Sequence, residues 1–215
     1  MLQAAAGQAG GEALDITDVF STYLYDGTGS TQTITNGIDL DGKGGLVWLK
    51  SRSNTYDNWL YDTVRGNTVR FISNSTAAQG FTGANGITSF NSDGFGLGAP
   101  FAEINGSGST FASWTFRKAP KFFDVVTYTG NGPSNTQNIS HNLGSTPGML
   151  VVKATSTTDN WHTWHRGFGD NGYIMLNSTN AKSTYADLWD DTAPTDTHFT
   201  VSDSCNTNNV TYVAY

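Results

Sequence analysis

Short stretches of alternating or continuous apolar residues run along most of the chain, and turn-forming residues separate them. The clearest stretch is GGLVWLKS at 44–51, an apolar run that two glycines precede. Runs of this kind, bounded by Gly, Asn, Asp and Ser, are typical of β-strands. The pattern predicts strands near 19–25, 31–36, 45–52, 58–64, 68–74, 86–97 and 109–117, and again near 122–129, 136–141, 148–155, 160–166, 172–177, 198–202 and 210–215.

The second half of the chain resembles the first in sequence. Tyr, Gly, Leu and Lys coincide when 25–50 is set against 128–153, at an offset of 103 residues. Self-similarity at a fixed period indicates tandem structural units. Further matches pair Asp57-Asn58-Trp59 with Asp159-Asn160-Trp161 at an offset of 102, Arg65-Gly66 with Arg166-Gly167, and TFASW at 110–114 with TYVAY at 211–215.

The repeat and the strand spacing together predict an all-β protein made of two tandem β-sandwich or jelly-roll-like repeats. The alternative is one larger, lectin-like sandwich built from both copies. In the second copy the last predicted strand stops at Tyr215, the counterpart of Trp114, so we expect it to be truncated. The expected parts are a flexible Ala/Gly-rich tail at 1–15, copy one at 16–117, a linker at 118–121 and copy two at 122–215.

The composition supports strands and turns over helices. Gly, Thr, Ser and Asn make up 93 of the 215 residues, and the acids divide into 16 Asp and 2 Glu. Such residues are poor helix formers and good turn formers. The net charge of −7 argues against a nucleic-acid partner, because phosphate binding needs clustered Lys and Arg. No apolar run approaches the roughly 20 residues that span a bilayer.

Four long strings carry a resemblance to known proteins: MLQAAAG at the start, VFSTYLYDGTGSTQTITNGIDLDGKGGLVWLKSRS, FASWTFRKAPKFFDVVTYTGNG and ISHNLGSTPGMLVVK. They resemble a family of virion structural proteins of tailed bacteriophages, notably marine ones. Its members are described as tail, fibre or appendage proteins, sometimes as lectin-like, and are usually longer than this chain. The resemblance implies a virion protein that is assembled in the host bacterial cytoplasm. It brings no catalytic motif with it.

The resemblance also implies partners. We expect the N-terminal tail to bind other virion proteins, and we expect a homo-oligomer, a trimer in the manner of phage fibres. The function that follows is a non-enzymatic tail-fibre, appendage or capsid-decorating component. A lectin-like glycan-binding module is the alternative, and a polysaccharide depolymerase is a weaker one, because no paired-carboxylate signature accompanies Glu103.

The candidate site for a host-surface glycan consists of aromatic and imidazole side chains. Trp59 and Trp161 occupy the repeated D-N-W element, and copy two adds His162, Trp164 and His165 in WHTWHRG. An aromatic face can stack on a sugar ring. The competing interpretation is that each tryptophan fills the core of its own copy. On a strand His162 and His165 face opposite ways, which argues against a shared metal ion.

The sequence implies no cofactor, and calcium is the one metal that its acidic segments leave open. The segment 39–44 (DLDGKG) has a faint likeness to a calcium loop, and 189–196 (WDDTAPTD) is an acidic loop of copy two. Both are better interpreted as turns or solvated loops, because the remaining ligand positions are absent. Cys205 is a single cysteine without metal-ligand spacing around it.

Overall fold

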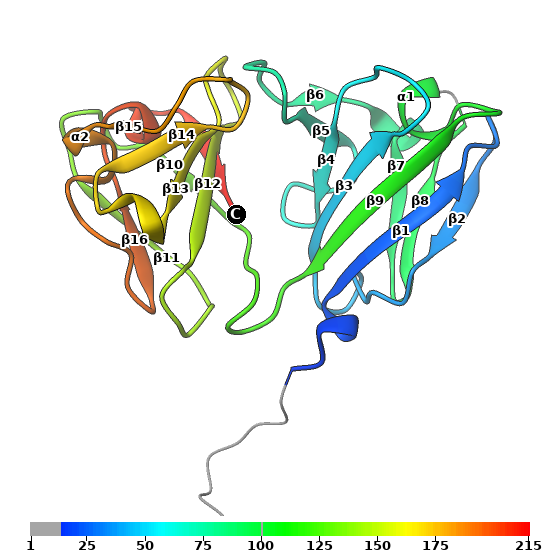
Figure 1. The fold of residues 1–215 in the computed structure, drawn as a ribbon, viewed down its shortest axis with the longest axis horizontal. Coiled ribbons are helices and arrows are strands. Elements are labelled where there is room, and N and C mark those ends of the chain that lie inside the picture. Colours follow the sequence, from blue (N-terminus) through cyan, green and yellow to red (C-terminus); the bar gives the residue numbers. More distant parts are fainter. Residues whose placement is uncertain (1–13, 100) are drawn as a thin grey trace, which may run out of the picture.

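The computed structural model describes residues 14–99 and 101–215, and the protein is all-β, as predicted (Figure 1). The predicted tail at 1–15 falls almost wholly outside these residues. The strands of the first half are β1 (Phe20–Asp26), β2 (Gln32–Thr35), β3 (Gly45–Ser51), β4 (Trp59–Asp62), β5 (Val69–Ile72), β6 (Gly80–Phe81), β7 (Ile87–Asn91), β8 (Gly94–Leu97) and β9 (Thr110–Arg117).

The second half follows the same plan. Its strands are β10 (Val126–Thr129), β11 (Gln137–Ser140), β12 (Met149–Ala154), β13 (His162–His165), β14 (Gly172–Met175), β15 (Ser183–Thr184), β16 (His198–Val201) and β17 (Thr211–Ala214). The helical elements are short: η1 (Ile16–Asp18), η2 (Gly83–Asn85), α1 (Ala102–Asn105), η3 (Arg166–Phe168), α2 (Ala186–Trp189) and η4 (Asp203–Asn206).

Each half contains one large and one small antiparallel sheet. In the described part of the chain the first large sheet has six strands, in the order β1-β9-β3-β4-β5-β6, and the second has six, in the order β10-β17-β12-β13-β14-β15. The small sheets are β2-β8-β7 and β11-β16. Strand for strand, the two large sheets therefore have corresponding orders.

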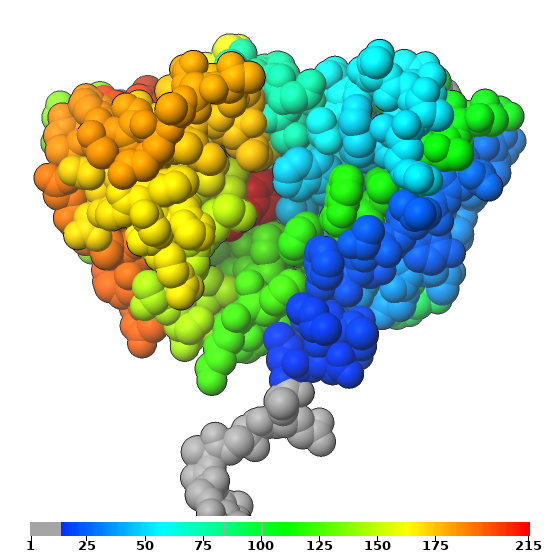
Figure 2. All heavy atoms as spheres, in the orientation of Figure 1, coloured from blue at the N-terminus to red at the C-terminus, as the bar shows by residue number. Residues whose placement is uncertain are grey.

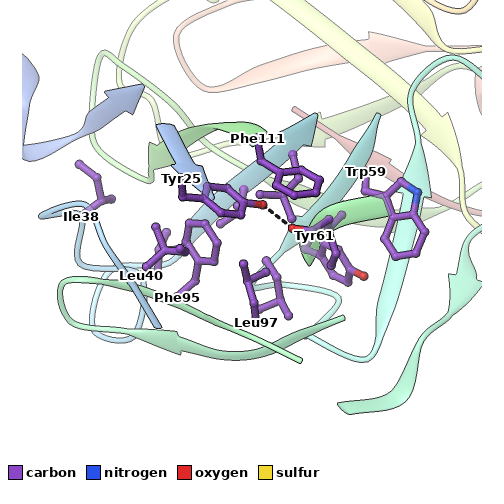
Figure 3. Packing of buried hydrophobic residues seen from close by; sticks show 13 residues of the cluster. Tyr25, Ile38, Leu40, Trp59, Tyr61, Phe95, Leu97 and Phe111 are labelled. Carbon is purple, nitrogen blue, oxygen red and sulfur yellow. Dashed lines mark hydrogen bonds between the residues drawn. The ribbon is translucent and has the colours of Figure 1, made fainter. Parts of the chain in front are cut away.

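A separate apolar core lies between the large and small sheet of each half. In the first half, Tyr25 and Phe111 of the large sheet face Phe95 of the small sheet, and all three are buried (Figure 3). The buried Tyr25 hydroxyl donates to the Ile104 carbonyl at 2.7 Å. In the second half Trp164, Tyr212 and Phe199 belong to the equivalent core. Each half is thus a β-sandwich of its own.

A third apolar cluster joins the two halves. The first large sheet contributes Leu46 of β3, Leu60 of β4 and Phe71 of β5, and the second half contributes Val151, Trp161 and Val213. The outer faces of the two large sheets therefore meet. The C-terminal end of the chain lies between them in Figure 1. The arrangement is two sandwiches packed against each other, and not one sandwich that shares a single core.

Three details of the strand prediction differ from the structure. The predicted strand 86–97 is a hairpin, β7 and β8, which turns before Gly94 (φ 154°). The predicted strand 122–129 begins only at Val126, because Phe123 pairs with Ala119 across a turn in which Lys121 has φ 63°. The two-residue edge strands β6 and β15 were not predicted, since such short pairs leave no periodic signal.

Candidate functional site

The three tryptophans predicted to stack on a glycan are buried. Trp59 and Trp164 are 3% exposed, and Trp161 is 0% exposed. His162 is 6% exposed, and only His165 of the five candidate residues lies on the surface. An indole inside the protein cannot stack on a sugar from solvent. The prediction that these side chains form an exposed aromatic platform is therefore wrong, and the core-packing interpretation explains them.

Trp59 and Trp164 each fill the core of their own half. Trp59 packs edge-on against Phe101, with ring centroids 5.1 Å apart, and the Arg70 guanidinium lies over its ring. Trp164 donates its Nε1–H to the Gly169 carbonyl at 2.9 Å. Both side chains combine apolar burial with stabilising polar contacts, which is the usual role of a core tryptophan.

Trp161 is not the structural counterpart of Trp59, although both close a D-N-W string. Leu49 and Val152 are corresponding positions at the offset of 103. Leu49 pairs with Trp59 in the first large sheet, whereas Val152 pairs with His162 in the second, so His162 is the counterpart of Trp59. The counterpart of Trp161 is instead Asn58: both backbone N–H groups donate to an asparagine, Asn74 or Asn177, 16 residues further on. The strand pairing therefore keeps the offset of 103 residues between the two halves. The D-N-W strings match at an offset of 102, and this match does not reflect structural equivalence.

This one-residue difference turns Trp161 toward the other half, because successive side chains on a strand face opposite sides. Its Nε1–H donates to the Ile72 carbonyl at 3.2 Å and to the Ser75 carbonyl at 3.0 Å. Its ring meets Phe71 edge-on at 5.2 Å. Trp161 thus contacts both the backbone and a side chain of the first half.

A buried polar cluster supports the same interface. The Arg65 guanidinium binds the Asp62 carboxylate at 2.6 Å, and the Tyr215 hydroxyl donates to that carboxylate at 2.7 Å. Arg65 Nη2 also lies 3.3 Å from the Tyr215 hydroxyl. Burial raises the pKa of the Tyr215 hydroxyl well above its usual value. The cluster joins β4 of the first half to the residue that follows β17.

Replacing Tyr215 by phenylalanine removes one hydrogen bond to the buried Asp62 carboxylate. We expect Tyr215→Phe to lower the free energy of unfolding by about 1.5–3 kcal/mol, the usual range for a hydrogen bond to a charged group. Denaturant titration followed by tryptophan fluorescence measures this change. The exposed Tyr23 of β1 supplies the control, since Tyr23→Phe should change the unfolding free energy by less than about 0.5 kcal/mol. Equal effects of the two substitutions would contradict the assigned role.

Lys153 is a buried lysine at the same interface. Its Nζ donates to the Thr76 carbonyl of the first half at 3.2 Å and to the Ala154 carbonyl at 3.0 Å. Burial lowers the pKa of Lys153 from 10.5 to about 8. The ammonium form of this side chain is therefore less favoured in the folded protein than in the unfolded chain.

The shifted pKa of Lys153 predicts a dependence of stability on pH. Between pH 8 and 10 the unfolded chain keeps a proton on Lys153 that the folded chain has released, so stability rises with pH, by up to about 1.4 kcal/mol per unit. Below pH 8 both states hold the proton and this contribution is constant. Unfolding curves across this range should show the rise in the natural chain and its loss in Lys153→Met. The same slope in both proteins would contradict the prediction.

A cleft lies beside the interface. Its volume is about 540 Å³, and its floor is apolar, formed by Trp48, Phe116, Phe123, Trp161 and Tyr215. Figure 2 shows the surface hollowed between the two halves, with C-terminal atoms deep in the hollow.

The rim of this cleft is basic in a protein whose net charge is −7. Lys121, His165 and Arg166 line it and are exposed, whereas its lining includes no Asp or Glu among the described residues. Met149, also in the lining, is 58% exposed although it is apolar. The cleft therefore combines an apolar floor with basic side chains at its rim.

The acidic loops considered for calcium form turns. The Asp39 carboxylate accepts the Gly42 N–H at 2.8 Å, and Asp190 Oδ2 accepts the Thr136 hydroxyl at 2.9 Å. Among residues 14–99 and 101–215, no three His, Cys, Asp or Glu side chains come together as a metal site would require. Cys205 is buried in the second core, and burial raises the pKa of its thiol well above the usual value.

Two buried asparagines, Asn105 and Asn206, are the structural residues that the sequence interpretation missed. Asn105 Oδ1 accepts the Thr28 N–H, and its Nδ2 donates to the Ser30 and Gly98 carbonyls. Asn206 makes the corresponding bonds, since its Oδ1 accepts the Asn131 N–H and its Nδ2 donates to the Gly132 and Asn135 carbonyls. The sequence does contain a sign of their equivalence. Asn105 stands five residues before Thr110, the first residue of β9, and Asn206 stands five residues before Thr211, the first residue of β17.

Each asparagine is accompanied by a tyrosine with the same role, Tyr25, which is buried, and Tyr128, which is partly buried. The Tyr25 hydroxyl donates to Ile104 and the Tyr128 hydroxyl to Cys205, the residue immediately before the asparagine in each case. Gly27 and Gly130 follow in a Tyr-x-Gly string, where an added Cβ would lie 2.1–2.2 Å from a carbonyl oxygen. The repeated Tyr, Gly and Asn positions thus fix the same loop in both sandwiches.

Comparisons with known proteins give a family but no described function. No curated protein matches the chain, and no solved structure matches it either. Within the described residues, none of the helices is long and apolar enough to cross a membrane. The model of one family, described as a domain of unknown function (DUF7483), matches residues 15–215. Because this match covers nearly the whole chain, the protein belongs to the DUF7483 family.

Proposed function

We propose that the protein is a non-enzymatic structural component of a bacteriophage virion, of the tail-fibre, appendage or capsid-decorating kind. The observation that carries this proposal is the interface between the two sandwiches. Trp161, Lys153 and Tyr215 all reach from the second half to backbone or charged groups of the first. Contacts of this kind hold two modules at a fixed spacing, which a load-bearing or spacing element of a particle requires. The resemblance of the four long strings supports the virion assignment.

The wider assembly follows from the same proposal. The virion contact is assigned to the N-terminal tail, and the oligomer is a homotrimer, as in phage fibres. Repetition by symmetry multiplies weak contacts into strong overall attachment. Light scattering coupled to size exclusion measures the oligomer directly. A mass of three chains supports this part of the proposal, and a monomer at micromolar concentration contradicts it.

Glycan binding is not retained as a second candidate. It depended on exposed indoles at Trp59, Trp161 and Trp164, and these side chains are buried.

The virion assignment is tested on particles. Purified virions of the phage that encodes the chain are analysed by mass spectrometry, and an antibody raised against the chain is used for immunogold labelling. The proposal predicts peptides of this protein at many copies per particle and gold at a defined location. Absence of the protein from intact, density-purified virions, while it is present in the infected lysate, would overturn the proposal.

A further inference from the structure

The first large sheet ends in a strand that has a neighbour on one side only. β1 pairs with β9 over its seven residues without a bulge, and β9 is its one partner strand among the described residues. The other edge strands of the two large sheets are shorter, since β6 and β15 have two residues each and β10 has four. Figure 2 shows β1, in blue, at the surface of the first half. Its outer edge is therefore the longest open edge in the described part of the large sheets.

Every second residue of β1 directs its backbone groups away from β9. At the two ends of the ladder, the Val19 carbonyl accepts from the Arg117 N–H at 2.7 Å and the Gly27 N–H donates to the Ser109 carbonyl at 2.8 Å. In an antiparallel ladder the residues that exchange both hydrogen bonds recur at every second position, so the odd-numbered residues of β1 bond to β9. The even-numbered residues direct their N–H and C=O groups outward, and within the strand these include Phe20, Thr22 and Leu24. Such groups are suited to pairing with another strand.

β1 carries none of the features that usually keep an open edge from pairing. Proteins commonly protect such edges with lysine, proline, a bulge or an inward-pointing charge. The segment 20–25 (FSTYLY) contains no charged residue and no proline. Two of its large side chains are exposed, Leu24 at 56% and Tyr23 at 38%. The edge therefore offers both unpaired backbone groups and apolar side chains to a partner strand.

Acidic residues at both ends of the edge restrict how β1 can pair with β1 of a second copy. Asp18 and Asp26 are both exposed. An antiparallel pairing centred on Thr22 would place Asp18 of each copy opposite Asp26 of the other, and like charges directly opposite each other are destabilising. A pairing centred on Tyr23 places both acids opposite uncharged residues. It also aligns outward-directed backbone groups, because Thr22 of each copy then stands opposite Leu24 of the other.

The pairing centred on Tyr23 also brings compatible side chains together. Successive side chains of a strand face opposite sides, so Tyr23 and Leu24 lie on different faces of the sheet. On one face Tyr23 of each copy stands opposite Tyr23 of the other. On the other face Leu24 stands opposite Thr22 and diagonal to Phe20, and aromatic and β-branched cross-strand pairs are favourable. The same patch serves both copies, which is the condition for a twofold contact.

We propose that the open edge of β1 binds the same edge of a second copy of this chain, antiparallel and centred on Tyr23. The N–H and C=O groups of Thr22 in each copy pair with those of Leu24 in the other. The two six-stranded large sheets thereby join into one continuous sheet across the twofold axis. This inference does not depend on the virion assignment. It is also compatible with a trimer, because a twofold contact doubles whatever assembly the chain otherwise forms.

The first test removes the backbone donor of the open edge. Thr22→Pro deletes an N–H that faces away from β9, a position at which an edge strand tolerates proline. Leu24→Lys keeps the backbone and places a charge on the exposed edge, and Thr22→Val is the matched control that keeps the N–H. Light scattering coupled to size exclusion gives the mass of each protein over a series of concentrations, and thermal unfolding confirms that each is folded. We expect the natural chain and Thr22→Val to reach twice the mass of Thr22→Pro and of Leu24→Lys.

The second test measures the register. In the proposed contact the two Tyr23 residues form a non-hydrogen-bonded pair, whose Cα atoms lie about 4.5 Å apart, within the range that a disulfide spans. Tyr23→Cys should therefore cross-link two chains under oxidised glutathione at least about tenfold faster than Ser21→Cys, which lies on the same face two residues away. Cys205 is buried and should not take part.

Two results would overturn the proposal. One is equal cross-linking at Tyr23→Cys and Ser21→Cys. The other is a natural chain whose mass equals that of folded Thr22→Pro at every concentration, whether both are monomers or both are trimers. The open edge would then be left to a different protein, and the trimer measured for the natural chain would still support the proposed assembly.

Discussion

Replacing Trp161 by alanine is expected to lower the free energy of unfolding by about 3–5 kcal/mol, the range for truncating a buried tryptophan. The cost has two physical sources. The substitution leaves a cavity against Phe71, it leaves the Ser75 carbonyl without its donor, and it leaves the Ile72 carbonyl with the Ser75 N–H alone. Because Trp161 lies between the halves, we also expect calorimetry to resolve two unfolding transitions in Trp161→Ala, where the natural chain shows one.

The control for this prediction separates the interface from a core. Trp59 lies in the core of the first half, so Trp59→Ala should cost a similar free energy but should lower the stability of that half without uncoupling it from the second. Trp161→Phe should fall between the natural chain and Trp161→Ala, because it keeps most of the packing and loses the donor. A single transition in Trp161→Ala with less than about 1 kcal/mol of destabilisation would contradict the assigned role.

The second large effect is expected at the two buried asparagines. Asn105→Ala and Asn206→Ala should each lower the free energy of unfolding by about 3 kcal/mol or more, because each removes several hydrogen bonds to buried or partly buried backbone groups. If the two loops are equivalent, the costs should agree within about 1 kcal/mol. Equilibrium unfolding in urea measures both.

Aspartate substitutions make the matched control. Asn105→Asp and Asn206→Asp keep the oxygen that accepts the Thr28 or Asn131 N–H and remove the amide donors. They should be destabilising as well, and their stability should fall further as pH rises, because a buried carboxylate would face carbonyl oxygens. A neutral effect at either position would show that the asparagine does not hold its loop.

The pattern of apolar and polar residues along the chain was sufficient to predict the all-β fold class and the positions of most strands. Apolar runs such as 45–51 are entered by glycines and left through polar turns, so local signals agree with the sheet they form. The repeat in sequence also corresponds to the shared order of strands in the two large sheets. Two-residue edge strands and the turn at Lys121 have no comparable signal, because tertiary pairing decides them.

The direction in which Trp161 points could not be read from the D-N-W string. A one-residue difference in register changes the face of a strand, and the string conceals that difference. The candidate glycan residues were chosen by type, and residue type cannot distinguish a buried indole from an exposed one. The cleft was also beyond prediction, since Trp48, Phe116 and Tyr215 come together only when the two sandwiches pack.

The central claim is that the two sandwiches form one rigid unit. Spin labels at Thr22→Cys on β1 and Thr129→Cys on β10, both exposed positions, report the distance between the halves in solution by pulsed electron paramagnetic resonance. Cys205 is buried and should stay unlabelled. We expect a single narrow distance distribution in the natural background and a broadened one with Trp161→Ala. A broad distribution in the natural background would contradict the account.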